Sequence, residues 1–209
     1  MRSLTVVLCA VLLLVTFCAK KGTVKPPGGD QLLWSSEAPR PQWAYEEVYA
    51  SEGMQPFVGM SHKYADEKSC RDDAERDSRL RATRFLETAA RETFERLSAE
   101  LGLTGEVFNP SNAARAYAEM VSQAVIQNAK VVKFYVEQRK SAASGEVYYL
   151  SFAKLQVPDQ NVKESFSAYT NRKKDEWKMA QEQIDRVNDA FYKYWDSKKA
   201  EQELKEPQK

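Results

Sequence analysis

The stretch KVVKFYVEQRKSAASGEVYYLSFAKLQV, residues 130–157, decides the fold of this chain. Side chains of different character alternate along its first ten residues. A period of two is typical of a β-strand, because neighbouring side chains point to opposite faces. One face takes Val132, Phe134 and Val136, and the other takes Lys133, Tyr135 and Glu137. Small residues at 141–145 supply a loop, and the alternation resumes over 146–157. The stretch therefore predicts two neighbouring strands.

The second of these strands carries apolar side chains on both of its faces. Tyr148, Leu150 and Phe152 lie on one face, and Val147, Tyr149, Ala153 and Leu155 lie on the other. Such a strand is covered on both sides, either by helices or by a partner. Residues 57–63, which read FVGMSHK, predict a further strand earlier in the chain.

Residues 69–101 are predicted to form a long helix between the first strand and the strand pair. Apolar residues recur there at spacings of three and four, and acidic residues repeatedly precede basic ones by four positions. Both patterns favour a helix with one solvated face. Ser69 followed by Asp72 is a capping-box-like start, and Gly102 is a natural C-terminal stop.

A second helix is predicted over residues 111–128, where apolar residues again share one face. It begins after Asn109-Pro110-Ser111, a typical helix start. Helices on a small antiparallel sheet define an α+β domain. The expected fold class is therefore α+β, with a small antiparallel sheet packed by two helices and followed by a long C-terminal amphipathic helix.

That C-terminal helix is expected to begin after Pro158 and to reach about Ala200. Its apolar residues follow an alternating three-four spacing, which is the heptad seam by which helices pair. Two outcomes are open, because the seam can pack on its own domain or against another subunit or envelope partner. In the second outcome the partner interface is formed by Trp177, Ile184, Val187, Phe191 and Trp195.

The first eighteen residues are typical of a bacterial export signal. Arg2 precedes a mostly apolar run from Leu4 to Phe17. As a helix this run would span roughly 21 Å, less than the bilayer's hydrocarbon core of about 30 Å. A charged start followed by a short apolar run predicts export and not a permanent membrane span.

The apolar run ends at Cys18, which resembles the bacterial lipoprotein signal. In that signal the cysteine is acylated and becomes the mature N-terminus, and several acyl chains anchor a protein firmly. Val15 and Thr16 fit the pattern, whereas Phe17 departs from the usual Gly, Ala or Ser. The alternative is an ordinary signal cut near Ala19, which leaves a soluble periplasmic protein.

The chain is expected to comprise four segments. The tether is predicted from its lysines, prolines and glycines, a composition that forms no core. The segments are a signal peptide with a lipobox-like end (1–18), a flexible tether (19–38), an α+β domain (39–157), and a long charged helix with a polar tail (158–209).

Composition disfavours several functional classes. Lys and Arg number 31 against 30 Asp and Glu, without a local basic block, which disfavours a nucleic-acid binder. The one histidine and the absence of a Cys-x-x-Cys motif leave no usual zinc site. We expect no cofactor and no metal, and no small-molecule substrate can be identified.

Catalysis would have to use His62, the only histidine. Cys70 follows it at the start of the predicted helix, so a Cys-His pair is geometrically conceivable. No third orienting group and no oxyanion-hole motif accompany the pair. We therefore expect a protein that is not an enzyme, with His62 a surface or half-buried residue and Cys70 a small residue of the first helical turn.

Four features follow one another along the chain: the segment Pro41-Gln42-Trp43, the Phe57-Val58-Gly59 strand, the Ala- and Arg-rich helix, and the two later strands. Together they resemble the Lpp-twenty family of bacterial surface lipoproteins. The resemblance covers roughly residues 39–157. It implies an outer-membrane or periplasmic lipoprotein without known catalytic residues, and some relatives are structural parts of flagellar basal assemblies.

The expected function is that of a non-enzymatic, membrane-anchored lipoprotein of the bacterial cell envelope. It would be held at the outer membrane, facing the periplasm, through acylated Cys18. It would serve as a structural or interaction component, within a larger envelope or flagellar assembly, through a protein partner or self-association. The alternative is a soluble periplasmic adaptor or binding protein released by an ordinary signal peptidase.

Overall fold

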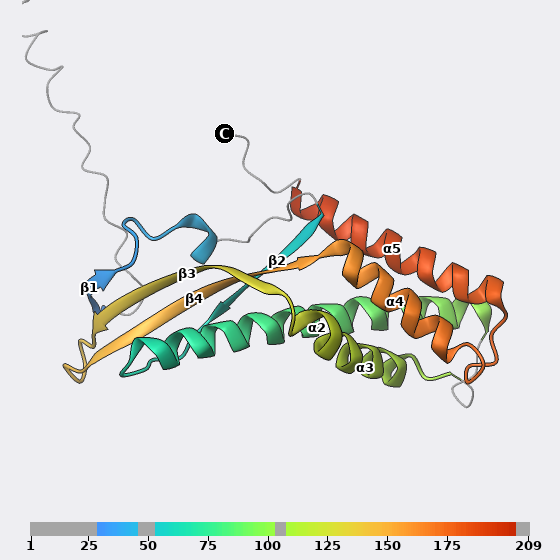
Figure 1. The fold of residues 1–209 in the computed structure, drawn as a ribbon, viewed down its shortest axis with the longest axis horizontal. Helices are drawn as coiled ribbons and strands as arrows, with labels where there is room; N and C mark the ends of the chain where they lie inside the picture. Colours follow the sequence, from blue (N-terminus) through green and yellow to red (C-terminus); the bar gives the residue numbers. More distant parts are fainter. Residues whose placement is uncertain (1–28, 46–52, 103–107, 204–209) are drawn as a thin grey trace, which may run out of the picture. The chain divides into compact units, whose positions relative to one another are not determined.

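A four-stranded antiparallel sheet in the order β1-β3-β4-β2 organises the fold (Figure 1). Its long central pair confirms the strands predicted from residues 130–157, with Tyr135 opposite Phe152. The strands are β1 (Gln31–Ser35), β2 (Met54–Met60), β3 (Lys130–Lys140) and β4 (Val147–Pro158). With the helices below, they make the α+β class expected from the sequence.

The computed structural model describes residues 29–45, 53–102 and 108–203. Contacts divide the chain into two compact units, Met1–Asp30 and Gln31–Lys209, and all the helices and strands below belong to the second. The predicted signal peptide and Cys18 lie outside the described residues. Within the described part, no helix is long and apolar enough to cross a membrane.

The helix α2 (Glu67–Leu101) covers one face of the sheet (Figure 1). It approaches β2 so closely that a Cβ on Gly59 would lie 2.2 Å from both the carbonyl oxygen of Ala74 and the amide nitrogen of Ser78. The helix begins one turn earlier than the predicted capping box, because Asp66 accepts the backbone hydrogen bond of Ser69. It ends at Gly102 as predicted, in the left-handed conformation.

The second helix is divided into two parts. An α-helix, α3 (Pro110–Val121), starts at the cap Asn109 and continues into a π-helical turn, η2 (Ser122–Ile126). The guanidinium of Arg79 on α2 donates a hydrogen bond to the backbone carbonyl of Ile126 at the end of this turn. The wider turn thus ends the helix against α2, just before β3 begins.

The C-terminal segment is a helical hairpin and not the single long helix predicted. It consists of α4 (Asp159–Lys173) and α5 (Gln181–Glu203), with Lys178 in the turn at a φ of 52°. Without a proline or glycine between them, the sequence offers no helix breaker. The chain reverses because the fold gains by burying Trp177 and Met179, which are 5% and 4% exposed.

The apolar seam of the C-terminal segment lies in the chain's own core. Its rings pack on those of α2 and α4; Phe191 stacks on Phe166 at 3.7 Å between ring centroids. The five residues predicted as a partner interface are at most 5% exposed: Trp177, Ile184, Val187, Phe191 and Trp195. That prediction is corrected, because the side chains are already covered by their own domain. Residues 158–203 accordingly belong to the same compact unit as the sheet and are not an extension of it.

The predicted tether also requires a correction. Residues 31–35, placed in the tether 19–38, form β1 and pair with β3, from Gln31 opposite Lys140 to Ser35 opposite Glu137. Edge pairing of this kind depends on a partner strand more than a hundred positions away, which local composition does not report. The described domain therefore begins at β1 and not at residue 39.

Candidate functional site

The face of the sheet opposite α2 is covered by a short segment, residues 36–45, that follows β1 (Figure 1). This segment contains one turn of 3-10 helix, η1 (Gln42–Ala44). Ala44 is buried against Tyr135 and Phe152, and Trp43 packs at the margin of the same small cluster. Trp43 therefore anchors its segment to the domain, and the cluster is separate from the main core.

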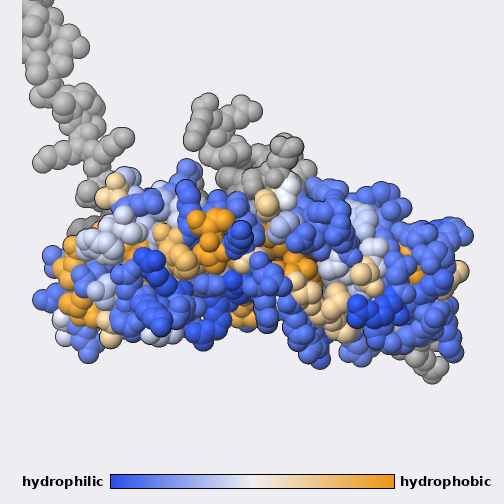
Figure 2. Space-filling view, in the orientation of Figure 1, coloured by the Kyte–Doolittle hydropathy of each residue, from blue (hydrophilic) through white to orange (hydrophobic). Residues whose placement is uncertain are grey.

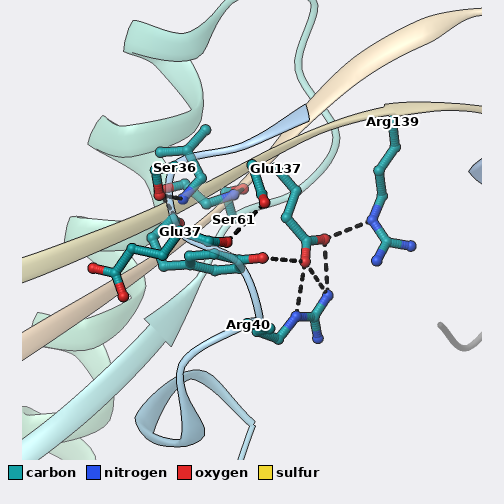
Figure 3. A network of polar contacts seen from close by, with 10 residues as sticks. Ser36, Glu37, Arg40, Ser61, Glu137 and Arg139 are labelled. Atoms are coloured by element: carbon teal, nitrogen blue, oxygen red, sulfur yellow. Dashed lines mark hydrogen bonds and ion pairs between the residues drawn. The ribbon is translucent and has the colours of Figure 1, made fainter. Parts of the chain in front are cut away.

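A buried carboxylate, Glu137 of β3, is the centre of this face (Figure 3). The Nε and Nη2 atoms of Arg40 donate hydrogen bonds to its two oxygens, each at 2.8 Å. The Nε of Arg139 donates at 2.6 Å and the hydroxyl of Tyr135 at 2.9 Å. The side chain of Glu137 is 2% exposed, that of Arg139 is 5% and that of Arg40 is 24%.

These contacts determine the charge state of the cluster. Burial alone would favour a protonated Glu137, but hydrogen bonds from Arg139 and then Arg40 outweigh it and hold the pKa of Glu137 below its ordinary value. Burial, followed by the adjacent carboxylate, raises the pKa of Tyr135, which keeps its hydroxyl a donor. The guanidinium of Arg40 also lies 5.0 Å from the centroid of the Phe152 ring.

The geometry of Glu137 suits a positioning role. Both of its carboxylate oxygens accept hydrogen bonds from guanidinium groups, so it has little capacity left to act as a general base. Its contact with Arg40 fastens residues 36–45 to the sheet. That segment directly continues β1, so the ion cluster also fixes the strand at the sheet's edge.

The edge strand β1 exposes three consecutive apolar side chains. Leu32, Leu33 and Trp34 are 44%, 44% and 48% exposed. In Figure 2, hydrophobic surface gathers at the end of the molecule where Figure 1 places β1. A contiguous apolar patch on a soluble domain commonly marks an interaction site. Neither β1 nor its exposed residues were recognised from the sequence, although the run Leu-Leu-Trp within a polar segment was a usable signal.

The opposite edge of the sheet, at β2, is protected. The amide of Met60 donates to a carboxylate oxygen of Asp77 at 2.9 Å, and the amide of His62 donates to Asp73 at 2.8 Å. Both acids belong to α2, which lies along this edge. Proteins commonly cover strand edges in this way to avoid unwanted pairing. Met60 is 48% exposed on β2, but the run of three consecutive exposed apolar side chains belongs to β1.

His62 and Cys70 contact different partners. The Nδ1 of His62 lies 2.9 Å from Asp73 Oδ2, on a side chain that is 88% exposed. The Sγ of Cys70 lies 3.0 Å from Ser61 Oγ and is fully buried. Burial raises the pKa of the Cys70 thiol, which disfavours the thiolate that a nucleophile requires. The geometry thus gives no support to a Cys-His pair.

Two other features offer little chemistry. An open hollow of about 470 Å³ lies beside the β3-β4 loop, lined by Lys63, Tyr64, Glu146 and Tyr148 among others. Its lining mixes both charges, and the ammonium of Lys63 lies 4.3 Å from the Tyr148 ring centroid. Across the part of the chain that the structure describes, no group of three His, Cys, Asp or Glu side chains is placed to hold a metal ion.

Comparison of the chain with known protein families, with curated proteins and with solved structures finds no match. The class of protein is therefore given by the structure alone: the sheet and its helices form an α+β domain. The resemblance to the Lpp-twenty family rests on the residues quoted from the sequence alone.

Proposed function

We propose that this chain is a membrane-anchored lipoprotein of the bacterial cell envelope, held at the outer membrane through acylated Cys18. The observation that carries the proposal is the position of Cys18 at the end of the apolar run after Arg2. Two further features support it: the described sheet and helices all lie in the unit Gln31–Lys209, and the chain resembles the Lpp-twenty lipoproteins.

The proposed role is structural or interactive, not catalytic. His62 and Cys70, the residues that a nucleophilic mechanism would need, face separate partners. The C-terminal seam is covered by the chain's own core, so a partner would have to meet another surface. The exposed residues of β1 are the apolar candidates for such a contact. The Lpp-twenty resemblance extends this role to a component of a larger envelope or flagellar assembly.

Fractionation of cells that produce the full chain tests the anchor. Cys18→Ser is expected to move the protein from the membrane fraction to the soluble envelope fraction. The matched control is Cys9→Ser, which changes the other cysteine of the apolar run and should leave the protein in the membrane fraction. Equal distribution of both variants with the unchanged chain would contradict acylation of Cys18.

The alternative is a soluble periplasmic adaptor or binding protein. The observation that favours it is Phe17, which occupies a position where the lipoprotein signal usually has Gly, Ala or Ser. It predicts a mature chain that begins at Lys20, carries no lipid and leaves the envelope on gentle osmotic release.

A further inference from the structure

We propose that Leu32, Leu33 and Trp34 of β1 contact the lipid surface of the membrane to which the chain is anchored. This inference rests on the proposed function, because it takes the occupant of the apolar edge from the position of the anchor. It adds a second membrane contact, made by the folded domain itself.

The side chains of β1 are suited to an edge-on contact with lipid. Leu32 lies opposite Arg139 and Trp34 opposite Gln138, with a register shift between them at Leu33. All three side chains are about half exposed, on a strand that has a neighbour on one side only among the strands that the structure describes. Tryptophan favours the boundary between headgroups and acyl chains, since its ring is apolar and its N–H is polar.

The register shift favours lipid over an added protein strand. A bulge interrupts the regular ladder of backbone groups that a pairing strand would need, and it turns the edge away from edge-to-edge association. An apolar contact with lipid needs no such ladder. The bulge at Leu33 therefore makes the edge less suited to pairing with another strand, while its side chains can still contact lipid.

The position of β1 in the chain brings it close to the anchor. Leu32 follows Cys18 by 14 residues. A segment of that length reaches at most roughly 50 Å when fully extended. In the described part of the domain, β1 is the first element after the anchor and is therefore held nearest to the membrane along the chain.

Several contacts hold β1 in place on the domain, so its exposed side chains form a fixed surface. The amide of Ser36 donates to the carbonyl of Val136 at 2.9 Å, and the amide of Val136 donates to Ser36 Oγ at 3.0 Å. A few residues later, Arg40 is bound to Glu137. The strand is therefore held between these contacts and its pairing with β3, so its apolar residues cannot simply turn into the core.

The charges beside β1 are of both signs. Lys140 is exposed and pairs with Gln31, and Glu37 and Glu146 are exposed as well. A contact driven by charge would weaken as salt screens it. With mixed charges at the margin, we expect a contact that is mainly apolar and that changes little between low and high salt.

Tryptophan quenching by brominated phospholipids tests the contact directly. The mature chain from Cys18, which contains the whole unit Gln31–Lys209, is coupled through the Cys18 thiol to maleimide-bearing lipid in vesicles. Cys70 is fully buried and does not compete. Trp177 and Trp195 are buried and Trp43 is half-buried, which leaves Trp34 as the exposed tryptophan.

We expect brominated lipid to quench most of the Trp34 emission, and the quenched share to disappear in Trp34→Phe. The double variant Leu32→Ser and Leu33→Ser should lose the greater part of this quenching. Leu80→Ser is the matched control, because Leu80 is 43% exposed on α2 and should not face lipid. Quenching should be unchanged by high salt.

Absence of Trp34 quenching on coupled vesicles would overturn the inference, as would equal quenching in Trp34→Phe. Light scattering on the same uncoupled chain adds a third result: a dimer that is lost in the double variant would assign β1 to self-association instead. Chemical coupling supplies the anchor in every case. The result is therefore separate from the question whether cells acylate Cys18, which fractionation answers.

Discussion

Arg40 donates two hydrogen bonds of 2.8 Å to the carboxylate of Glu137, a residue 97 positions further along the chain. The contact joins the segment after β1 to the central strand β3 and is completed by Arg139 on the same strand. Together with the two hydrogen bonds between Ser36 and Val136, it links residues 36–45 to the sheet, so variants at this contact report how the β1 edge is held.

Glu137→Ala is expected to lower the free energy of unfolding by about 3–5 kcal/mol, because it leaves the guanidinium of Arg139 buried without its partner. Arg40→Ala should cost less, about 1–2 kcal/mol, since Arg40 is partly solvated. Urea denaturation measures both. The control is Arg186→Ala, which removes an exposed i,i+4 pair and should cost about 0.5 kcal/mol or less. Equal losses of unfolding free energy in Glu137→Ala and Arg186→Ala would show that the buried cluster stabilises the fold no more than an exposed ion pair does.

Stability should fall in acid partly through Glu137. Its native pKa lies below its ordinary value, so the folded state favours the ionised form. The stabilisation is complete above the ordinary glutamate pKa of about 4.3 and is lost as the pH falls through the lower native pKa. Glu137→Gln should flatten this part of the stability-pH curve, measured by urea denaturation between pH 7 and pH 3. An unchanged slope in the variant would exclude Glu137 as a source.

Gly59→Ala is expected to be strongly destabilising. The new Cβ would lie 2.2 Å from backbone atoms of Ala74 and Ser78, so α2 must move away from β2. Overpacking of this kind costs about 2–3 kcal/mol. Gly145→Ala is the comparison, because it meets open space and bears only the cost of a positive φ, about 1–2 kcal/mol. A thermal melt separates the two; similar losses would mean that the α2–β2 approach can relax.

Phe191→Ala tests the corrected assignment of the C-terminal seam. Phe191 is fully buried and stacked on Phe166, so we expect a loss of about 3–5 kcal/mol in the free energy of unfolding. Phe191→Leu should cost less because it leaves a smaller cavity. The oligomeric state, followed by light scattering, should be unaffected in the folded variant. Unaltered stability together with a lost oligomer would restore the partner interface.

Elements with strong local patterns could be predicted from the sequence. The alternation over 130–157 identified β3 and β4, and the helix that ends at Gly102 was identified by its periodicity and its stop. The acidic and basic residues spaced four apart also form ion pairs on α2, as the ion pair between Glu75 and Arg79 shows.

Features that depend on distant partners could not be predicted in this way. β1 is a strand only because β3 lies beside it, and its five residues carry no alternation of their own. The reversal at Lys178 has no glycine or proline to mark it and follows from burial of Trp177. Arg40 and Glu137 are too far apart in the chain for spacing to connect them. The candidate site is made of such long-range contacts, and was therefore the part that sequence patterns missed.

The anchor at Cys18 remains the claim on which the proposed function depends most. Intact mass and fragment spectra of the mature N-terminal peptide, taken from protein recovered from bacterial membranes, test it most directly. Acylation predicts a chain that begins at Cys18 and carries the mass of several acyl groups on that residue. A mature chain that begins at Lys20, with no added lipid mass, would contradict it.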